Sequence, residues 1–573
     1  MSSKNETIKK ESIGLRGAIA AEIDKGIDHF EERELQLLKF HGSYQQDDRD
    51  LRRERRKAGL EKAWQFMVRS KIPGGHLSSE QYLVHDRMAD ELSNGTLRFT
   101  NRQGIQQHGV LAGSLKDCIH RINTCGLTTY GACGDIVRNT MSCAVPIEDP
   151  AIEEARLLAK EISETFYARS RAYAEIWLDG EKREIENEEH DDPIYGPTYL
   201  PRKFKIGIAV PPFNDVDLLT HDVGLVADVQ GKRIVGFDIY AGGGMGMSFG
   251  NLQTHPSLAQ PLFYVRRNQI LDTLKAIVTA QRDFGRRDDR KQARLKYLVR
   301  DRGIVWFRNE VASRLDFAPT PHKSIQLGTV DDLLGWSHQS NGFSFYGLWL
   351  PDGRVADTSL GRYRSAIREI CETFDPQLTI TPNANLYFSD IPDSARVSFY
   401  QILQRHKIPD ATTFSRARRT SHACVSLPTC GLALAESERV FQTLMDSLDS
   451  LLALLGIHEE PLLIRMSGCP NGCARPYNAD IAFVGKAPGK YSIFVGGSHR
   501  GDQLASLWKK SVSFEEIAQT LRPLLETFVS NRLHKETFSD YWHRTSPNTK
   551  FAKNSEQFHT EQEETETTTL VSP

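Results

Sequence analysis

The sequence predicts an α+β fold assembled from two related halves. Four short stretches recur in the same order roughly 240 to 290 residues farther along the chain, which indicates an internal duplication. Strand-like runs such as KIGIAVPPF alternate with amphipathic helical patterns such as PAIEEARLLAKEISETFYARS. The recurring pairs are 69–81 with 348–359, 97–110 with 378–391, 138–146 with 419–428, and 235–246 with 491–501.

Composition narrows the class of protein. A chain of 573 residues exceeds one hydrophobic core, so about two to four domains are expected. The net charge of -2 indicates neither a nucleic acid nor a membrane as a partner. No apolar run of about 18 residues is present, so no spanning helix is expected. The polar start MSSKNETIKKESIGLRG lacks a secretory leader, and the expected location is therefore the cytoplasm.

Both ends of the chain are polar. Residues 1–65 are interpreted as a helical N-terminal arm, in which the basic run at 49–59 is either a solvated helix or a partner-binding surface. Residues 546–573 are acidic and repetitive, which predicts a disordered tail. The stretch EKREIENEEHDDP at 181–193 predicts an exposed acidic loop.

Four of the 9 cysteines fall into two turn-rich pairs. An odd number of cysteines in a reducing compartment favours metal binding or catalysis over disulfides. The spacing C-x5-C followed by C-x3-C suits a four-iron cluster with four thiolate ligands. A structural zinc site is the alternative, although its pairs are usually about two to four residues apart, and unligated cysteines are the third reading. The pairs are Cys424 with Cys430 and Cys469 with Cys473.

A second set of residues is basic. In LRFTNRQ, the alternation of a strand puts Arg98, Thr100 and Arg102 on one face, and in PRKFK two lysines point the same way. Each charge alone is typical of a solvated strand. Together they predict a pocket for a polyanion, such as a carboxylate-rich cofactor, a small oxyanion or phosphate. The set comprises Arg69, Arg98, Arg102, Arg138, Arg202, Lys203 and Lys205.

The glycine-rich segment AGGGMGMSFG at 241–250 follows a strand-like run, GFDIY. A dinucleotide loop needs G-x-G-x-x-G at the start of a helix, and the following MSFGNLQTHPS is a poor helix. We therefore exclude NAD binding here and expect a glycine-rich strap that packs against a flat ligand.

The cysteine motifs in their contexts, ACVSLPTCGLALAE and GCPNGCARP, resemble the siroheme and four-iron, four-sulfur signature of the sulfite and nitrite reductases. Four further stretches resemble the assimilatory, NADPH-dependent sulfite reductases of that family: FHGSYQQDDRD (40–50), FTNRQGIQQHG (99–109), RAYAEIWLD (171–179) and YLPRKFKIGIAVPP (199–212). The resemblance spans nearly the whole chain, and it also accounts for the duplication.

The resemblance implies a duplicated, pseudo-two-fold siroheme sulfite/nitrite reductase fold with ferredoxin-like half-domains. Residues 66–130 and 333–411 would be the half-domains of one discontinuous domain. Residues 131–332 would form a siroheme-binding α/β domain. Residues 412–545 would form a second domain, for siroheme and the [4Fe-4S] cluster.

The resemblance also implies roles for the motif residues. The anion-binding and proton-supplying set would be Arg69, Arg138, Lys203 and Lys205. The ring carboxylates would meet Arg98, Thr100, Arg102 and Arg202. The cluster would be held by Cys424, Cys430, Cys469 and Cys473, of which Cys473 would also reach the siroheme iron beside Asn471. One departure is the turn at 383–385, which reads Asn-Ala-Asn where the family often has Asn-Gln-Asn.

The implied reaction is the six-electron reduction of sulfite to sulfide, in sulfate assimilation and cysteine biosynthesis. The implied cofactors are siroheme and a [4Fe-4S] cluster. NADPH would act indirectly, through a flavoprotein (alpha) component in a hetero-oligomer, because the chain has no convincing nucleotide fold of its own. The alternatives are a ferredoxin-dependent nitrite or sulfite reductase and a non-enzymatic zinc-binding protein.

Overall fold

The computed structural model of the chain divides into two compact units, each described by itself. Unit 1 contains Met1–Gly244, Ser257–Phe414 and Leu427–Gly431, and unit 2 contains Met245–Pro256, Ser415–Ser426 and Leu432–Pro573. Most of the expected loop at 181–193 and of the expected tail at 546–573 lies outside the described residues. The structure describes residues 3–12, 14–169, 176–178, 181–183, 192–340, 342–546 and 558.

The N-terminal segment is part of unit 1 and not a separate arm. Its strand β1 (Ser43–Asp47) pairs antiparallel with β2 (Trp64–Arg69), so the expected boundary after residue 65 divides a strand pair. Ile8 and Leu37 are buried in the same core as the α/β sheet of unit 1, which anchors two of the helices. The helices are α1 (Lys4–Lys10), α2 (Ile19–Asp24), α3 (Glu32–Leu38) and α4 (Arg52–Lys57).

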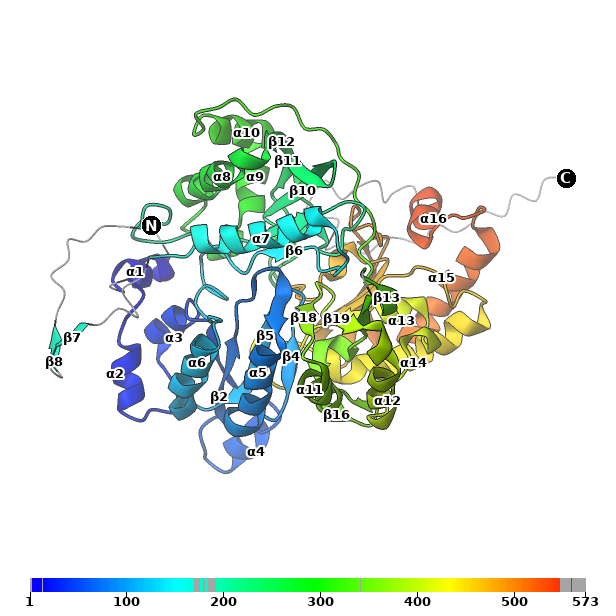
Figure 1. Ribbon diagram of the computed structural model, residues 1–573, viewed down its shortest axis with the longest axis horizontal. Coiled ribbons are helices and arrows are strands. Elements are labelled where there is room, and N and C mark those ends of the chain that lie inside the picture. Colours follow the sequence, from blue (N-terminus) through cyan, green and yellow to red (C-terminus); the bar gives the residue numbers. More distant parts are fainter. Residues whose placement is uncertain are drawn as a thin grey trace. The chain divides into compact units, whose positions relative to one another are not determined.

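The first half-domain contains a five-stranded sheet in the order β1-β2-β5-β4-β15. Two helices, α5 (Ser79–Leu92) and α6 (Leu115–Thr124), pack against it (Figure 1). Helix α5 begins at a capping box, because Ser78 and Gln81 each accept a hydrogen bond from the other's backbone N–H. The other strands are β4 (Leu97–Phe99), β5 (Ile105–Val110) and β15 (Arg354–Val355).

The second half-domain repeats this design with the order β13-β14-β19-β18-β3. The two half-domains exchange strands, since β3 (His76–Ser78) pairs with β18 and β15 pairs with β4. Each sheet is completed by the other half of the sequence. The remaining elements are β13 (Gly335–His338), β14 (Phe343–Leu348), β16 (Asp357–Thr358), β17 (Gly361–Arg362), α11 (Tyr363–Phe374), β18 (Gln377–Ile380), β19 (Leu386–Pro392) and α12 (Arg396–Arg405).

Unit 1 also contains an α/β sheet in the order β12-β11-β10-β9-β6. The pairs β6–β9 and β9–β10 are parallel, and β10–β11 and β11–β12 are antiparallel. The strands are β6 (Met141–Ser142), β9 (Ile206–Ala209), β10 (Val223–Gln230), β11 (Arg233–Ala241) and β12 (Gln260–Arg266). The helices are α7 (Pro150–Thr165), α8 (Ile270–Phe284), α9 (Leu295–Arg302) and α10 (Ile304–Ala312), and β7 (Ile176–Leu178) and β8 (Glu181–Arg183) form a separate hairpin.

Unit 2 contains a sheet of the same topology, β20-β21-β22-β23-β24, with two parallel pairs followed by two antiparallel pairs. This identity of strand order and direction confirms the predicted duplication. The strands are β20 (His422–Ala423), β21 (Ile464–Ser467), β22 (Ile481–Ala487), β23 (Lys490–Val495) and β24 (Ser506–Ser513). The helices are α13 (Arg416–Thr420), α14 (Glu438–Leu454), α15 (Ile517–Asn531) and α16 (Phe538–Thr545).

The recurring sequence pairs fall on equivalent elements. PGG and PDG form matching 3-10 turns, η1 (Pro73–Gly75) and η6 (Pro351–Gly353), in which Gly74 and Asp352 both adopt left-handed backbone conformations. In the part of the chain that is described, none of the helices combines the length and the apolar character that a bilayer crossing needs.

Candidate functional site

Part of the predicted basic set forms a row on one face of the first half-domain sheet. Arg69 of β2 and Arg98 of β4 both lie opposite Gln106 of β5, from its two sides. Residues directly opposite each other across a sheet point to the same face. Arg354, in the exchanged strand β15, lies opposite Arg98 and extends the row. Burial and the proximity of Arg98 lower the pKa of Arg354 to about 9.

Thr100 fixes the turn that carries Arg102. Its hydroxyl oxygen accepts hydrogen bonds from the backbone N–H groups of Arg102 (3.4 Å) and Gly104 (3.2 Å). The side-chain amide of Gln103 donates to the backbone oxygens of Gly74 (2.9 Å) and Ser142 (3.1 Å), which ties the turn to η1 and to β6. The turn is therefore rigid, and the structure shows Thr100 in a structural role within it.

Arg102 is held among cations. Its Nη2 donates to the backbone oxygen of Asn139 at 2.6 Å, while its buried Nε has no hydrogen-bond partner among the described residues. Burial, together with nearby cations that include Arg138 and Arg294, lowers the pKa of Arg102 to about 9, and Asp222 offsets this only in part. A bound anion would accept a hydrogen bond from this Nε, and its negative charge would offset the surrounding cations.

Lys203 and Lys205 precede β9 and are both partly exposed, whereas Phe204 between them is buried. Burial within the surrounding protein lowers the pKa of Lys205 well below its usual value, and the charges of Arg102 and Lys203 lower it further. The carboxylate of Asp222 accepts a hydrogen bond from the backbone N–H of Lys205 at 3.0 Å. A partly exposed lysine among cations is suited to bind an oxyanion and to release a proton to it.

The rest of the predicted basic set consists of Arg138, Arg69 and Arg202. Arg138 is buried, and its Nε donates to the backbone oxygen of Gly134 at 2.7 Å. Arg69 Nη1 donates to the sulfur of Cys133 at 3.1 Å. Arg202 lies 4.0 Å from Asp135, yet burial and nearby cations, Arg290 first, lower its pKa to about 10.

Positive charge exceeds negative charge in this part of unit 1. Asp222 is paired with Arg294 at 2.6 Å, and Asp135 with Arg290 at 2.5 Å, so these carboxylates offset the charges of Arg102 and Arg202 only in part. A bound polyanion would offset both the repulsion and the desolvation that lower these pKa values. The donor set therefore fits a carboxylate-rich macrocycle such as siroheme together with a small oxyanion.

In unit 2, three of the predicted cysteine ligands lie close together. Burial, and after it the proximity of Cys473 and Cys424, raises the pKa of the Cys469 thiol to about 12. The backbone N–H of Gly468 donates to Cys424 Sγ, and the Asn471 side chain donates to Cys469 Sγ, both at 3.3 Å. Thiolates this close repel one another unless a metal or cluster shares them, so the residues fit a metal centre. All nine cysteines are free of disulfides.

Cys430, the fourth predicted ligand, belongs to the loop Leu427–Gly431 of unit 1. Arg49 holds this loop twice. Its backbone N–H donates to the oxygen of Pro428 at 3.2 Å, and its Nη1 donates to the backbone oxygen of Cys430 at 2.9 Å. The N-terminal segment therefore positions the chain at Cys430, which the sequence analysis did not predict.

The glycine-rich strap packs against the turn that carries Cys469 and Cys473. The N–H of Met247 donates to the oxygen of Pro470 at 2.9 Å. A Cβ on Gly246 would meet the backbone oxygen of Asn471 at 3.1 Å, and one on Gly472 would meet that of Met245 at the same distance. Both glycines allow this close approach of two backbones. Contact of the strap with a flat ligand stays a prediction.

Three functional candidates were missed by the sequence analysis. Arg294 and Lys296 donate to the backbone oxygens of Gly243 (3.2 Å) and Gly244 (3.0 Å) in the glycine-rich segment, and Lys71 is a buried lysine two residues after Arg69. The alternation Arg-Leu-Lys at 294–296, like that in PRKFK, was the signal for the first two.

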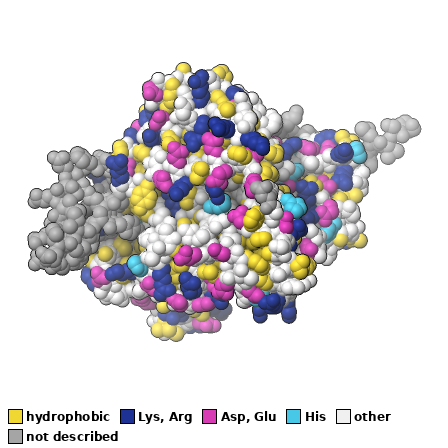
Figure 2. Space-filling model, viewed as in Figure 1, with side chains coloured by type: hydrophobic (Ala, Val, Ile, Leu, Met, Phe, Trp, Pro, Cys, Tyr) yellow, Lys and Arg dark blue, Asp and Glu magenta, His cyan; other side chains and the backbone are white. Residues whose placement is uncertain are grey.

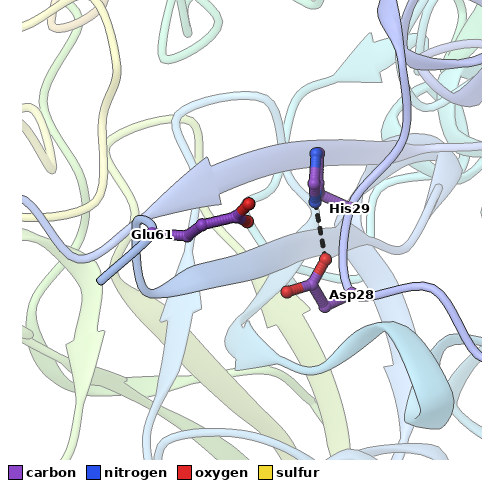
Figure 3. A group of neighbouring side chains, drawn as sticks. All are labelled: Asp28, His29 and Glu61. Atoms are coloured by element: carbon purple, nitrogen blue, oxygen red, sulfur yellow. Dashed lines mark hydrogen bonds and ion pairs between the residues drawn. The ribbon is translucent and has the colours of Figure 1, made fainter. Parts of the chain in front are cut away.

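A separate group of side chains that could hold a metal ion lies elsewhere in unit 1, as Figure 3 shows. His29 Nδ1 lies 2.6 Å from the Asp28 carboxylate, and its ring stacks on Trp64 at 4.9 Å. Asp28 and Glu61 are exposed. This is the arrangement of an ordinary surface ion pair, and it contributes nothing to the basic site or the cysteine centre.

Comparison with known families agrees with this geometry. A model of the nitrite and sulphite reductase 4Fe-4S domain matches residues 159–318, and a model of the nitrite/sulfite reductase ferredoxin-like half domain matches residues 61–124. The first stretch contains Lys203 and Lys205 but no cysteine. It therefore corresponds to the copy of the duplicated unit that lacks the predicted cluster ligands.

Similar proteins cover nearly the whole chain. The sulfite reductase [NADPH] hemoprotein beta-components of Staphylococcus carnosus and Staphylococcus saprophyticus are each 42% identical over 537 residues, 94% of this chain and 94% of theirs. That of Shouchella clausii is 41% identical over 538 residues, with the same coverage. The solved structure of Mycobacterium tuberculosis NirA covers 97% of both chains with a TM-score of 0.76 at 22% identity, which confirms the predicted fold class.

Proposed function

This chain belongs to the family of sulfite reductase [NADPH] hemoprotein beta-components, and from that premise we propose that it reduces sulfite to sulfide by six electrons. Two observations, taken together, carry the proposal: the surplus of cations in unit 1 and the close cysteines in unit 2. The cations suit an oxyanion and a polycarboxylate, and the cysteines suit an iron–sulfur cluster.

The proposed roles of the residues follow from their surroundings. Arg98, Arg102 and Arg202 would hold the carboxylates of siroheme, and Thr100 would keep the turn of Arg102 rigid. Cys424, Cys430, Cys469 and Cys473 would hold the [4Fe-4S] cluster, with Cys473 shared with the siroheme and Asn471 donating to a neighbouring sulfur. When bound, siroheme and the cluster would supply the redox chemistry.

The protein's own contribution is charge and protons. Each oxygen of sulfite leaves as water, so proton supply matters as much as electrons. Arg69 and Arg138 would bind the anion as permanent cations, because arginine keeps its charge. Lys203 and Lys205 would bind it and also donate protons, since the lowered pKa of Lys205 makes its ammonium a stronger acid.

The proposal also covers the protein that donates the electrons. The relatives are named NADPH-dependent beta-components, and we propose that NADPH reaches this chain through a flavoprotein alpha component in a hetero-oligomer. The alternative donor, ferredoxin, would replace that partner without changing the site.

The first test is analysis of the anaerobically purified chain. We expect a siroheme spectrum with about five irons and four acid-labile sulfides per chain, and sulfite turnover with reduced methyl viologen. Cys473→Ser should lose turnover and alter the spectrum, whereas Cys125→Ser, a cysteine outside both motifs, should change neither. One zinc per chain and no visible colour would refute the proposal and leave a zinc-binding protein.

A further inference from the structure

The short helix α4 (Arg52–Lys57, RRERRK) carries a basic patch that the proposed function does not use. Arg52 is paired with Asp47 at 2.5 Å, and Arg55 donates to the backbone oxygen of Glu61 at 2.5 Å. In the described part of the chain, Arg53, Arg56 and Lys57 have no ion-pair partner, and all three are exposed. Four of these cations line a shallow depression: Arg52, Arg53, Arg56 and Lys57.

This arrangement differs from that of several other arginines on the surface of unit 1. Basic and acidic side chains are interspersed over the face shown in Figure 2, and several arginines of unit 1 are paired with carboxylates. Arg267, for example, contacts Glu154 and Glu161, and Arg314 contacts Asp283. Like charges three or four residues apart destabilise a helix, so stability does not explain the patch on α4.

Two exposed apolar side chains flank the patch. Leu51, just before α4, is 41% exposed, and Leu60, three residues after it, is 56% exposed. Protein interfaces combine apolar contacts with a charged rim, whereas nucleic-acid sites rely mainly on positive charge and hydrogen bonds. The leucines therefore favour a protein partner.

The patch adjoins the chain at a predicted cluster ligand. Arg49, three residues before α4, donates from its backbone to Pro428 and from its side chain to Cys430. The six residues of α4 span only about 9 Å at 1.5 Å per residue. A partner bound to α4 is therefore close to the loop that carries Cys430.

We propose that α4 is the docking site of an acidic protein that donates one electron at a time to the cluster. The inference rests on the proposed function. In each encounter the donor would be oxidised by one electron and the cluster reduced by one, so six encounters supply one sulfite. Attraction between the acidic donor and Arg53, Arg56 and Lys57 would speed the encounter and orient the donor toward the Cys430 loop.

The test uses flavodoxin as the acidic donor, mixed with holoenzyme in an anaerobic stopped-flow instrument. The flavodoxin is photoreduced with a deazaflavin, because dithionite would release sulfite. The measured quantity is the second-order rate constant for reduction of the holoenzyme as ionic strength rises. The variant is Arg53→Glu with Arg56→Glu. The matched control is Lys232→Glu with Arg233→Glu, two exposed cations at the turn between β10 and β11.

We expect the wild-type rate constant to fall steeply with salt. The α4 variant should be slower by about tenfold or more at low salt and should lose most of the salt dependence. The control should stay within about twofold of wild type, since it carries the same change in charge. An unchanged rate in the α4 variant, or an equal loss in the control, overturns the proposal.

Two further readouts separate the alternatives. Turnover with methyl viologen, a small donor that needs no docking, should be the same in wild type and in both variants. Absence of this turnover in wild type would refute the proposed function, whereas its retention beside a slower flavodoxin reaction supports α4 docking. If the α4 variant loses retention on immobilised single-stranded RNA but keeps the flavodoxin rate, the patch is a nucleic-acid site and the docking proposal is wrong.

Discussion

Lys205 is a residue of the basic site whose charge can be titrated. Burial and neighbouring cations lower its pKa in the folded chain, so it becomes neutral at a lower pH than an ordinary lysine. Only the cation binds an anion well. The affinity for sulfite should therefore decrease as the pH rises through the lowered pKa, by up to about tenfold per pH unit.

The measurement is the dissociation constant of sulfite, from the change in the visible spectrum between pH 6 and 9. Sulfite itself changes protonation in this range, and Lys205→Arg controls for that, because arginine keeps its charge to a higher pH than lysine does. This variant should show a flatter pH profile than wild type, and Lys205→Met should bind weakly at every pH. Equal pH profiles for wild type and Lys205→Arg would contradict the assignment.

Lys71 should destabilise the fold at neutral pH. It is 3% exposed, and burial lowers its pKa from 10.5 to about 8. The buried ammonium is thus unfavourable below pH 8, and the penalty disappears as the pH rises from about 8 to 10.5. Lys71→Met should stabilise the apoprotein at pH 7 by about 3 kcal/mol, seen as a higher melting temperature, and by little at pH 10.5. If Lys71→Met lowered the melting temperature at pH 7, the Lys71 ammonium would have a stabilising partner and the prediction would be wrong.

At the scale of elements, the guanidinium of Arg294 packs against the segment that follows β11 and leaves room only for glycine at position 244. A Cβ on Gly244 would lie 2.5 Å from Nη1 of Arg294, whose guanidinium is paired with buried Asp222. Gly244→Ala should displace this arginine and leave the carboxylate without its partner, at a cost of about 3 kcal/mol. Urea unfolding measures the loss. Gly113→Ala is the control, because a Cβ there meets nothing within 4 Å, and a similar loss in both would contradict the argument.

The sequence predicted equivalent elements better than it predicted contacts. The turns at 100–104 and 381–385 are superimposable in their bonding, since Thr381 accepts from the N–H groups of Asn383 and Asn385 as Thr100 does in its own turn. Ala384 takes the place of Gln103 there, and it lacks the amide that ties the first turn to its neighbours. The repeat therefore identified the turns, and the residues show that different amides hold them: Asn383 donates to the backbone oxygen of Val330 at 2.7 Å, and the Asn385 side chain donates to the Asp332 carboxylate at 2.8 Å.

Other features carried no sequence signal. Strands β3 and β15 contain three and two residues, too few to show a period of two, so their exchange could not be read from alternation. The position of Arg354 in the basic row follows from that exchange. The pairing of Asp222 with Arg294 depends likewise on a fold that joins distant parts of the chain. Motifs therefore predicted most of the residues that we propose for the site, and the topology added Arg354.

At the scale of the whole molecule, the strand exchange joins the two half-domains through their sheets. Helices α5 and α11 add a buried ion pair between them, in which Asp86 accepts from Arg364 at 2.7 Å and from Arg368 at 2.5 Å. We propose on this basis that residues 66–130 and 333–411 fold together, as the expected discontinuous domain. A substitution that destabilises one half-domain should then also destabilise the other half-domain.

Hydrogen exchange of Asp86→Ala tests this coupling. The substitution leaves two arginines without their buried carboxylate, which costs about 3 kcal/mol, equivalent to roughly a hundredfold faster exchange of amides that open with the whole unit. If the half-domains fold as one, this increase should reach the amides of β18 and β19 as well as those of β4 and β5. Asp288→Ala, at an exposed carboxylate, is the control and should leave both sheets protected. Faster exchange confined to β4 and β5 would show that the halves open separately, because the exchanged strands would then be too short to transmit the loss.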